Sequence, residues 1–228
     1  MLRGRIAPVI QDDEISRALV YLAYLLFILL VLFAIAYSNW QIALIGITEL
    51  MFILMGKAWA TQAGVNVQDR RLTKRETAKI GTGVLIALVG FGLADLTVAP
   101  LFGLFGSAST FFGGYLTTLP QATVIPIASL VVLLGAIAEE VFFRQAAFNY
   151  FASRGGMVTG LVVSAVIFGI AHIPVDGLNL PVLTILTISG GINAFGGVYS
   201  GKLSSCILAH LANNAISLGL LSVILVIH

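Results

Sequence analysis

The chain has 228 residues, of which 59% are hydrophobic and only 10% are charged. This composition excludes an ordinary soluble globular domain, which holds fewer apolar and more charged residues. The formal net charge is +2, and the basic residues lie between apolar stretches, so no basic face is available for a nucleic acid. Apolar segments of about 20 residues recur, and each can cross the roughly 30 Å core of a lipid bilayer as a helix. We therefore expect an all-α polytopic transmembrane bundle that forms one integral membrane domain, residues 1–228.

Seven apolar stretches are long enough to be membrane spans. They cover about residues 18–38, 40–60, 80–100, 121–153, 157–173, 181–200 and 203–227. Residues 101–120 are also apolar but rich in Gly, Ser and Thr, which predicts a loop at membrane depth or a short extra helix. The expected number of helices is therefore seven or eight.

Lys and Arg residues fall on one side of these spans. They precede the first span at positions 3–17, and they recur at positions 70–79, between the second and third spans. Arg154 and Lys202 fall on the same side if residues 101–120 do not cross the membrane. Because basic loops are retained in the cytoplasm, we expect a cytoplasmic N-terminus and an external His228.

Small residues recur at a spacing near four along the span at 181–200 and just beyond it. A stripe of this kind predicts close packing against another helix. Its members are Gly190, Gly191, Ala194, Gly197 and Gly201.

Ionisable residues inside a bilayer are costly, so each one suggests a function. Glu49 and Asp95 stand singly, and we expect them to pack or to hydrogen-bond to another helix. Glu139, Glu140 and Arg144, by contrast, lie within about one and a half helical turns. Glu140 and Arg144 are four residues apart and can form an ion pair. On an α-helix the side chain of Glu139 points about 100° away from that of Glu140, so Glu139 is not expected to pair with Arg144. A desolvated carboxyl group without an arginine partner suits general acid and base chemistry.

Two later helices carry the remaining polar groups. Phe168 and His172 are four residues apart, so the phenyl ring can form a wall beside the imidazole. His210 and Asn214 project from one face of an otherwise apolar stretch. Counted from the polar turns, Glu139 and His172 reach a similar depth and His210 a somewhat shallower one. Convergence of the three helices on one site is therefore feasible.

A carboxylate and two imidazoles can act in two ways. Glu139, His172 and His210 can bind a divalent metal such as zinc, with an open position for water. They can instead hold and deprotonate a water directly, with Asn214 orienting the water or binding an oxyanion. A zinc-bound Glu139 would leave no base, because Glu140 is expected to pair with Arg144. The sequence therefore favours Glu139 as the base, with any metal bound weakly by the histidines, while a metal requirement stays open.

Three motifs stand in order along residues 121–217. They are Glu-Glu-x-x-x-Arg at Glu139–Arg144, Phe-x-x-x-His at Phe168–His172, and His-x-x-x-Asn at His210–Asn214. With these motifs the sequence resembles the CAAX-protease and bacteriocin-processing family (CPBP, or ABI) of intramembrane proteases, which includes the Ras-converting prenyl-protein endopeptidases. One departure from the family pattern is Gln145, where a glycine commonly follows the arginine.

The resemblance implies an intramembrane endopeptidase with a catalytic core at about residues 121–217. Its substrate would be a membrane-associated peptide or protein, and whether the substrate is prenylated stays open. The resemblance further implies that Glu139 activates the water, that Glu140 and Arg144 support the site, and that the site is completed by His172, His210 and Asn214.

Two other classes of function compete with a protease. One is a non-catalytic membrane scaffold or bacteriocin-immunity-type protein of the same fold, which would bind a peptide through the polar site. The other is a small transporter that uses the buried charges as an ion path. The sequence has no visible inverted repeat, and its buried charges cluster in one half, so the transporter is disfavoured.

Overall fold

The computed structural model describes residues 9–36, 40–62, 64–65, 71–101 and 121–227. These residues form helices and no named strand, although an isolated bridge joins Gln11 to Lys202. In chain order the elements are α1 (Glu14–Ala36), α2 (Trp40–Gln62), α3 (Lys74–Leu101), α5 (Gln121–Glu140), the π-helical segment η1 (Val141–Phe148), α6 (Asn149–Gly155), α7 (Met157–Ala171), α8 (Ile173–Asp176), α9 (Leu180–Ser200) and α10 (Leu203–Ile227).

The predicted all-α bundle is confirmed, and long helical stretches follow the predicted spans within a few residues at most ends. Elements α5, η1 and α6 continue one another, as expected for the fourth span. The fifth span is divided into α7, with 15 residues, and the short α8, with 4. Residues 102–120, and with them the question of an eighth helix, lie outside the described part of the chain.

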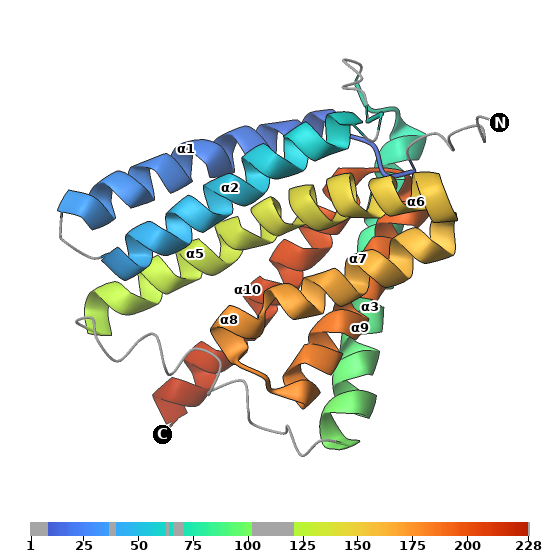
Figure 1. The fold of residues 1–228 in the computed structure, drawn as a ribbon. Helices are drawn as coiled ribbons and strands as arrows, with labels where there is room; N and C mark the ends of the chain where they lie inside the picture. Colours follow the sequence, from blue (N-terminus) through green and yellow to red (C-terminus); the bar gives the residue numbers. More distant parts are fainter. Residues whose placement is uncertain (1–8, 37–39, 63, 66–70, 102–120, 228) are drawn as a thin grey trace.

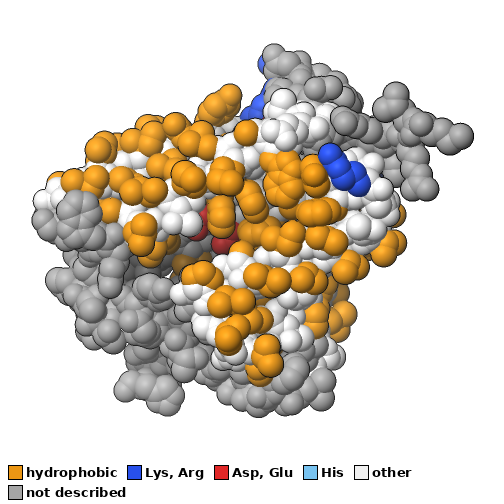
Figure 2. Space-filling view, viewed as in Figure 1, with side chains coloured by type: hydrophobic (Ala, Val, Ile, Leu, Met, Phe, Trp, Pro, Cys, Tyr) orange, Lys and Arg blue, Asp and Glu red, His pale blue; other side chains and the backbone are white. Residues whose placement is uncertain are grey.

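Within the described part of the chain, four helices are long and apolar enough to cross a membrane: Glu14–Ala36, Ile42–Gln62, Lys74–Thr97 and Leu180–Ser200. The apolar helices Met157–Ala171 and Leu203–Leu218 are shorter. Large apolar side chains on α1, α2 and α3 are exposed on the outside of the bundle. Figure 2 shows apolar side chains over most of the face where side chains are coloured. An outer surface of this kind suits contact with lipid chains.

The helices form two groups (Figure 1). Helices α1, α2 and α5 run side by side and contact one another. In the other group α9 packs against α3, α7 and α10. The π-helical segment η1 contacts α2 of the first group and α7, α9 and α10 of the second, so it lies where the two groups meet.

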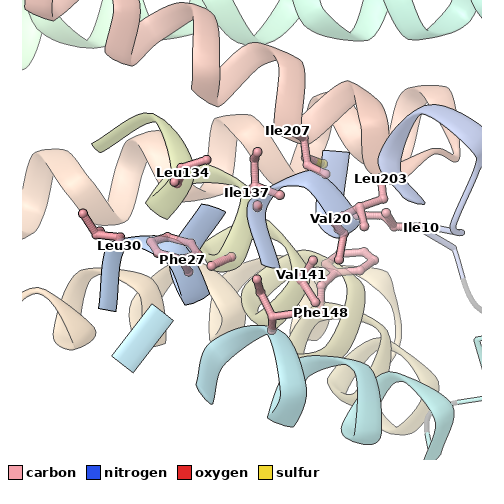
Figure 3. Packing of buried hydrophobic residues seen from close by; sticks show 14 of the residues in the cluster. Ile10, Val20, Phe27, Leu30, Leu134, Ile137, Val141, Phe148, Leu203 and Ile207 are labelled. Carbon is pink, nitrogen blue, oxygen red and sulfur yellow. The ribbon is translucent and has the colours of Figure 1, made fainter. Parts of the chain in front are cut away.

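Buried apolar side chains fill the space between helices (Figure 3). Phe27 of α1, Ile137 of α5 and Ile207 of α10 belong to one buried cluster. Lipid chains are as apolar as these side chains, so within a bilayer the cluster is stabilised mainly by close van der Waals contact. Shape complementarity is therefore the main demand on these positions.

The backbones of α3 and α9 approach each other most closely at a pair of glycines. A Cβ atom added to Gly83 would lie 2.6 Å from the Gly196 carbonyl oxygen, and one added to Gly196 would lie 2.6 Å from that of Gly83. A Cβ atom added to Gly190 or Gly197 of the predicted stripe would also come too close to neighbouring side chains, whereas one added to Gly191 would make ordinary van der Waals contacts. The sequence thus predicts tight packing on this helix but misses Gly196, which lies off the predicted stripe.

Residues Val9–Asp13, here called the N-terminal strap, run between the ends of other helices before α1 begins. The side-chain oxygen of Asn149 accepts hydrogen bonds from the amides of Val9 and Ile10, at 2.9 and 3.1 Å. The Asn149 amide donates to the Ile10 carbonyl oxygen at 2.7 Å. The backbone of Gln11 bonds to the turn between α9 and α10 at 3.1 and 2.8 Å. The strap therefore ties α6 to that turn.

Asp12 ties the strap to α2 as well. It is 2% exposed, and its Oδ2 atom lies 2.8 Å from Lys57 Nζ. Burial alone would raise the Asp12 pKa, but the Lys57 charge and hydrogen bonds from Lys57, Ser16 and Gln145 outweigh burial and lower this pKa from its ordinary value of 3.8. A buried but charged aspartate thus holds the strap in place.

Candidate active site

Glu140 and Arg144 lie where α5 passes into η1, and both side chains are buried. The Nε atom of Arg144 is 3.1 Å from Glu140 Oε2, so the ion pair predicted from the four-residue spacing is present. Arg144 Nη2 also donates to the Gly190 carbonyl oxygen at 3.1 Å. The guanidinium carbon lies 4.4 Å from the centroid of the Phe168 ring. This set of contacts compensates both charges for their burial.

The π-helical turn that carries Arg144 is packed against α2. A π-helix closes its hydrogen bonds over five residues rather than four, so its turn is wider than an α-helical turn. Phe142 stacks on Phe52 and contacts Trp59, with ring centroids 5.0 and 5.7 Å apart. A Cβ atom on Gly56 would lie 3.0 Å from Phe142 Cα, so only a glycine lets the α2 backbone come this close. Segments of this kind often mark functional sites, and this one begins directly after Glu140.

His210 of α10 is the second partner of Glu140, with Nδ1 2.8 Å from Glu140 Oε1. A carboxylate paired with an arginine can only accept, so His210 donates from Nδ1 and its neutral form keeps a lone pair on Nε2. That Nε2 atom lies 3.9 Å from Glu139 Oε2. The sequence predicts Arg144 alone as the partner of Glu140. The bond from His210 corrects this, and residue spacing cannot reveal it because it comes from another helix.

Glu139 differs from Glu140 in the solvent exposure of its side chain. Its side chain is 17% exposed, whereas that of Glu140 is 0% exposed. Figure 2 shows acidic side chains inside a hollow on a face that is otherwise mostly apolar. A carboxylate with this exposure can meet a water molecule, while both oxygens of Glu140 are already bound by protein groups.

His172 lies at the end of α7, beside the Phe168 ring. The two ring centroids are 4.7 Å apart, and the Phe168 ring is 6.0 Å from that of His210. His172 Nδ1 lies 2.8 Å from the Phe168 carbonyl oxygen, which can only accept, so Nδ1 carries the proton and Nε2 the lone pair. Phe168 thus contacts both histidines and Arg144, in agreement with its predicted place as a wall.

Asn214 lies one turn beyond His210 and reaches across to α5. Its amide nitrogen donates to the Val132 carbonyl oxygen at 3.2 Å. An amide group has two N–H bonds, so one remains for another acceptor. This bond orients the Asn214 side chain toward the helix that carries Glu139.

Glu139, His172 and His210 are the predicted metal ligands. Among the described residues, no group of three or more His, Cys, Asp or Glu side chains is arranged to hold a metal ion. These three side chains therefore do not fit a zinc site in this arrangement.

Two residues near the site have contacts that the sequence does not predict. Glu49 of α2, which stands singly in the sequence, approaches Glu139 over Gly135. Gln145, where the family commonly has glycine, is buried and hydrogen-bonds to Asp12 of the N-terminal strap. Both contacts come from distant parts of the chain, and no short motif carries a signal for them.

Comparison with protein families matches residues 120–216 to the model described as Rce1-like, type II CAAX prenyl endopeptidase. The predicted family resemblance is confirmed. No curated protein and no solved structure matches the chain. The Rce1-like region contains all seven residues of the three motifs, and it includes the π-helical segment.

The Rce1-like match and the apolar helices together support a general assignment. The apolar helices indicate an integral membrane protein, and residues 120–216 are similar to a family of membrane endopeptidases. The transporter alternative finds no support in this match.

Proposed function

We propose that the protein is an intramembrane endopeptidase in which Glu139 activates the water that cleaves a peptide bond. The observation that carries the proposal is the difference between the two adjacent carboxylates. Glu140 is fully buried and bound by Arg144 and His210, whereas Glu139 is partly exposed beside His210 Nε2. A base must reach the proton that it removes, and only Glu139 has that access.

The reaction follows from these positions. A water held by Glu139 and His210 Nε2 gives a proton to the Glu139 carboxylate while its oxygen attacks the peptide carbonyl carbon. The resulting oxyanion can accept a hydrogen bond from the second N–H of Asn214. Glu139 then returns the proton to the leaving nitrogen, and the C–N bond breaks to give an acid and an amine. His172, with its lone pair on Nε2, lies at the same wall and completes the polar lining.

We propose that Glu140, Arg144 and Phe168 support this reaction without taking part in it. Glu140 fixes the His210 ring through Nδ1, so that Nε2 is the atom turned toward Glu139. Arg144 pairs with Glu140, and the Phe168 ring lies beside both the guanidinium and the imidazoles. The catalytic core in this proposal is residues 121–217 of a single membrane domain, residues 1–228.

The proposal is tested by cleavage of fluorogenic membrane peptides by purified protein. We expect Glu139→Gln to fold normally and to lose at least about 100-fold in kcat, because an amide cannot accept the proton. Asp95→Asn on α3, an exposed residue, serves as a matched control and should keep the wild-type rate. Normal turnover by Glu139→Gln would remove Glu139 from the mechanism. A folded wild-type protein that binds peptides and cleaves none would favour the scaffold or immunity-type alternative.

We propose that the substrate enters from the membrane and that a prenyl group assists its binding. The matching family consists of prenyl endopeptidases, and the acidic hollow in Figure 2 is bordered by apolar side chains. We expect a farnesylated peptide to be cleaved with a lower KM than the same peptide without the lipid. Equal KM values for the two peptides would argue against a role of the prenyl group.

We also propose that the N-terminus is cytoplasmic. The ends of several helices meet near the N-terminal strap, where Lys57 pairs with Asp12 and Lys202 with Glu76, at 2.8 and 3.2 Å. This basic end matches the side that is retained in the cytoplasm. In a Cys206→Ser background, a cysteine at position 154 should be labelled from the cytoplasm and one at position 228 from outside. Cytoplasmic labelling of both positions would contradict an odd number of crossings.

A further inference from the structure

A cavity lies between α1 and α2, which run side by side (Figure 1). Its volume is about 650 Å³, within the range of roughly 300–1,000 Å³ that is usual for cavities that bind small molecules. The described residues that line this cavity include none of the candidate active-site residues. Tyr21, Tyr24 and Leu54 line it and are exposed on the outside of the bundle, so the cavity can be reached from the surrounding lipid.

One end of the cavity is charged. Arg17, near the start of α1, and Lys57, near the end of α2, both line it. Lys57 donates one N–H bond to Asp12 at 2.8 Å, and an ammonium group has three such donors. The Lys57 side chain is 35% exposed. Asp12 also lines the cavity, so two positive charges and one negative charge leave this end with a formal charge of +1.

The cavity becomes apolar toward the middle of the two helices. Val20 and Ile53 line it and are buried, and Leu54 lies one turn before Lys57. Tyr24 lies about 10 Å further along α1 than Arg17, at about 1.5 Å per residue. Tyrosines are common where a helix passes from lipid headgroups into the hydrocarbon core. The charged end, the tyrosines and the apolar part thus follow the order of the phosphate, the glycerol esters and the acyl chains of a phospholipid.

We propose that this cavity binds an anionic phospholipid, with the phosphate between Arg17 and Lys57 and an acyl chain along the apolar wall. The single negative charge of a phosphodiester balances the formal charge of +1 at this end. A zwitterionic phospholipid carries an additional cationic group, which would be repelled by the basic side chains. The anionic lipid is therefore preferred. This inference does not depend on the proposed peptidase reaction.

A lipid titration tests the chemical class of the ligand. Delipidated protein in detergent micelles is mixed with dioleoyl phosphatidylglycerol or with dioleoyl phosphatidylcholine, which has the same acyl chains. Binding is measured by native mass spectrometry and as a rise in Tm, because a ligand of the folded state stabilises that state. We expect the wild type to bind phosphatidylglycerol at least about 5-fold more tightly. Equal affinities for the two lipids would overturn the proposal, and so would an equal rise in Tm with inorganic phosphate alone.

Two pairs of variants test the position of the lipid. Arg17→Gln should weaken phosphatidylglycerol binding about 5-fold, whereas Arg154→Gln, which removes an exposed cation from α6, should bind this lipid like the wild type. Leu54→Trp should weaken the binding of both lipids because the indole fills the apolar part of the cavity. Leu44→Trp is its control, at an exposed position of α2 that does not line the cavity.

Wild-type binding of phosphatidylglycerol by folded Arg17→Gln, or by Leu54→Trp, would overturn the proposal. Equal losses in a variant and its control would do the same, since the lipid would then bind without a defined position. Leu54 is exposed, so its replacement leaves the packing between helices intact. The Leu54 and Leu44 pair therefore decides the question even if Arg17→Gln fails to fold.

Discussion

Arg144 offers the sharpest test of how the site is supported, because its side chain is buried and pairs with Glu140. Arg144→Ala removes the 3.1 Å contact to Glu140, the 3.1 Å hydrogen bond to the Gly190 carbonyl oxygen and the contact with the Phe168 ring. Glu140 then stays buried with His210 as its remaining partner. Removing one member of a buried ion pair costs about 3–5 kcal/mol, which lowers the ratio of folded to unfolded protein by about two to four powers of ten.

The assay is thermal and denaturant unfolding in detergent micelles, together with the yield of monodisperse protein. Arg154→Ala is the matched control, because Arg154 is exposed and stacks on Tyr150, and it should lose less than about 1 kcal/mol. The double variant Glu140→Gln with Arg144→Met should recover part of the loss, since the glutamine oxygen can still accept from His210. An Arg144→Ala protein that unfolds like the wild type would refute the buried ion pair.

Three further predictions concern packing, pH and metal. Gly83→Ala should destabilise the protein by about 1–3 kcal/mol in micelle unfolding, because the added methyl group would meet the Gly196 carbonyl oxygen. Gly92→Ala on the same helix is the control, since the added methyl group meets no other atom there, and it should be neutral or stabilising by up to about 1 kcal/mol. Because the pKa of Asp12 is lowered in the folded protein, the contribution of Asp12 to the free energy of unfolding is complete above the ordinary value of 3.8 and is lost as the pH falls through the lowered pKa. The free energy of unfolding of Asp12→Asn should lack this acid-dependent contribution. A pH profile identical to that of the wild type would speak against the pair with Lys57. Peptide cleavage should survive exhaustive chelation of metal ions. The metal-free reaction would be overturned if metal analysis found one zinc ion per chain, and if activity were lost when the zinc is removed and restored when it is added back.

Features that depend on local spacing could be predicted from the sequence. Long apolar runs between polar turns give the helices, because a bilayer-spanning segment must satisfy its own backbone hydrogen bonds. The Glu140–Arg144 ion pair follows from residues four apart on a helix, and its geometry is as expected. The position of Phe168 beside His172 follows in the same way.

Contacts between distant helices could not be predicted, because they depend on how the helices rotate against one another. The His210–Glu140 bond joins α10 to α5 and decides which imidazole nitrogen faces Glu139. Glu49 looks isolated in the sequence, yet the missing side chain at Gly135 brings it to Glu139. The close approach of Gly56 to Phe142 of η1 likewise joins two separate helices. The three candidate metal ligands likewise come from different helices, and residue types alone do not fix the directions of their side chains.

The N-terminal strap also bears on the order in which the protein is assembled. During synthesis, Val9–Asp13 leaves the ribosome before the helices α1 to α10, but its partners Asn149 and the turn between α9 and α10 are made only after much of the chain has been inserted. Until then the strap amides have water as their partner, whereas Asp12 can pair with Lys57 as soon as α2 is made. A polypeptide arrested before α10 would therefore lack the bonds of Gln11 to the turn between α9 and α10, and protease sensitivity at residues 9–13 would report whether insertion had been completed.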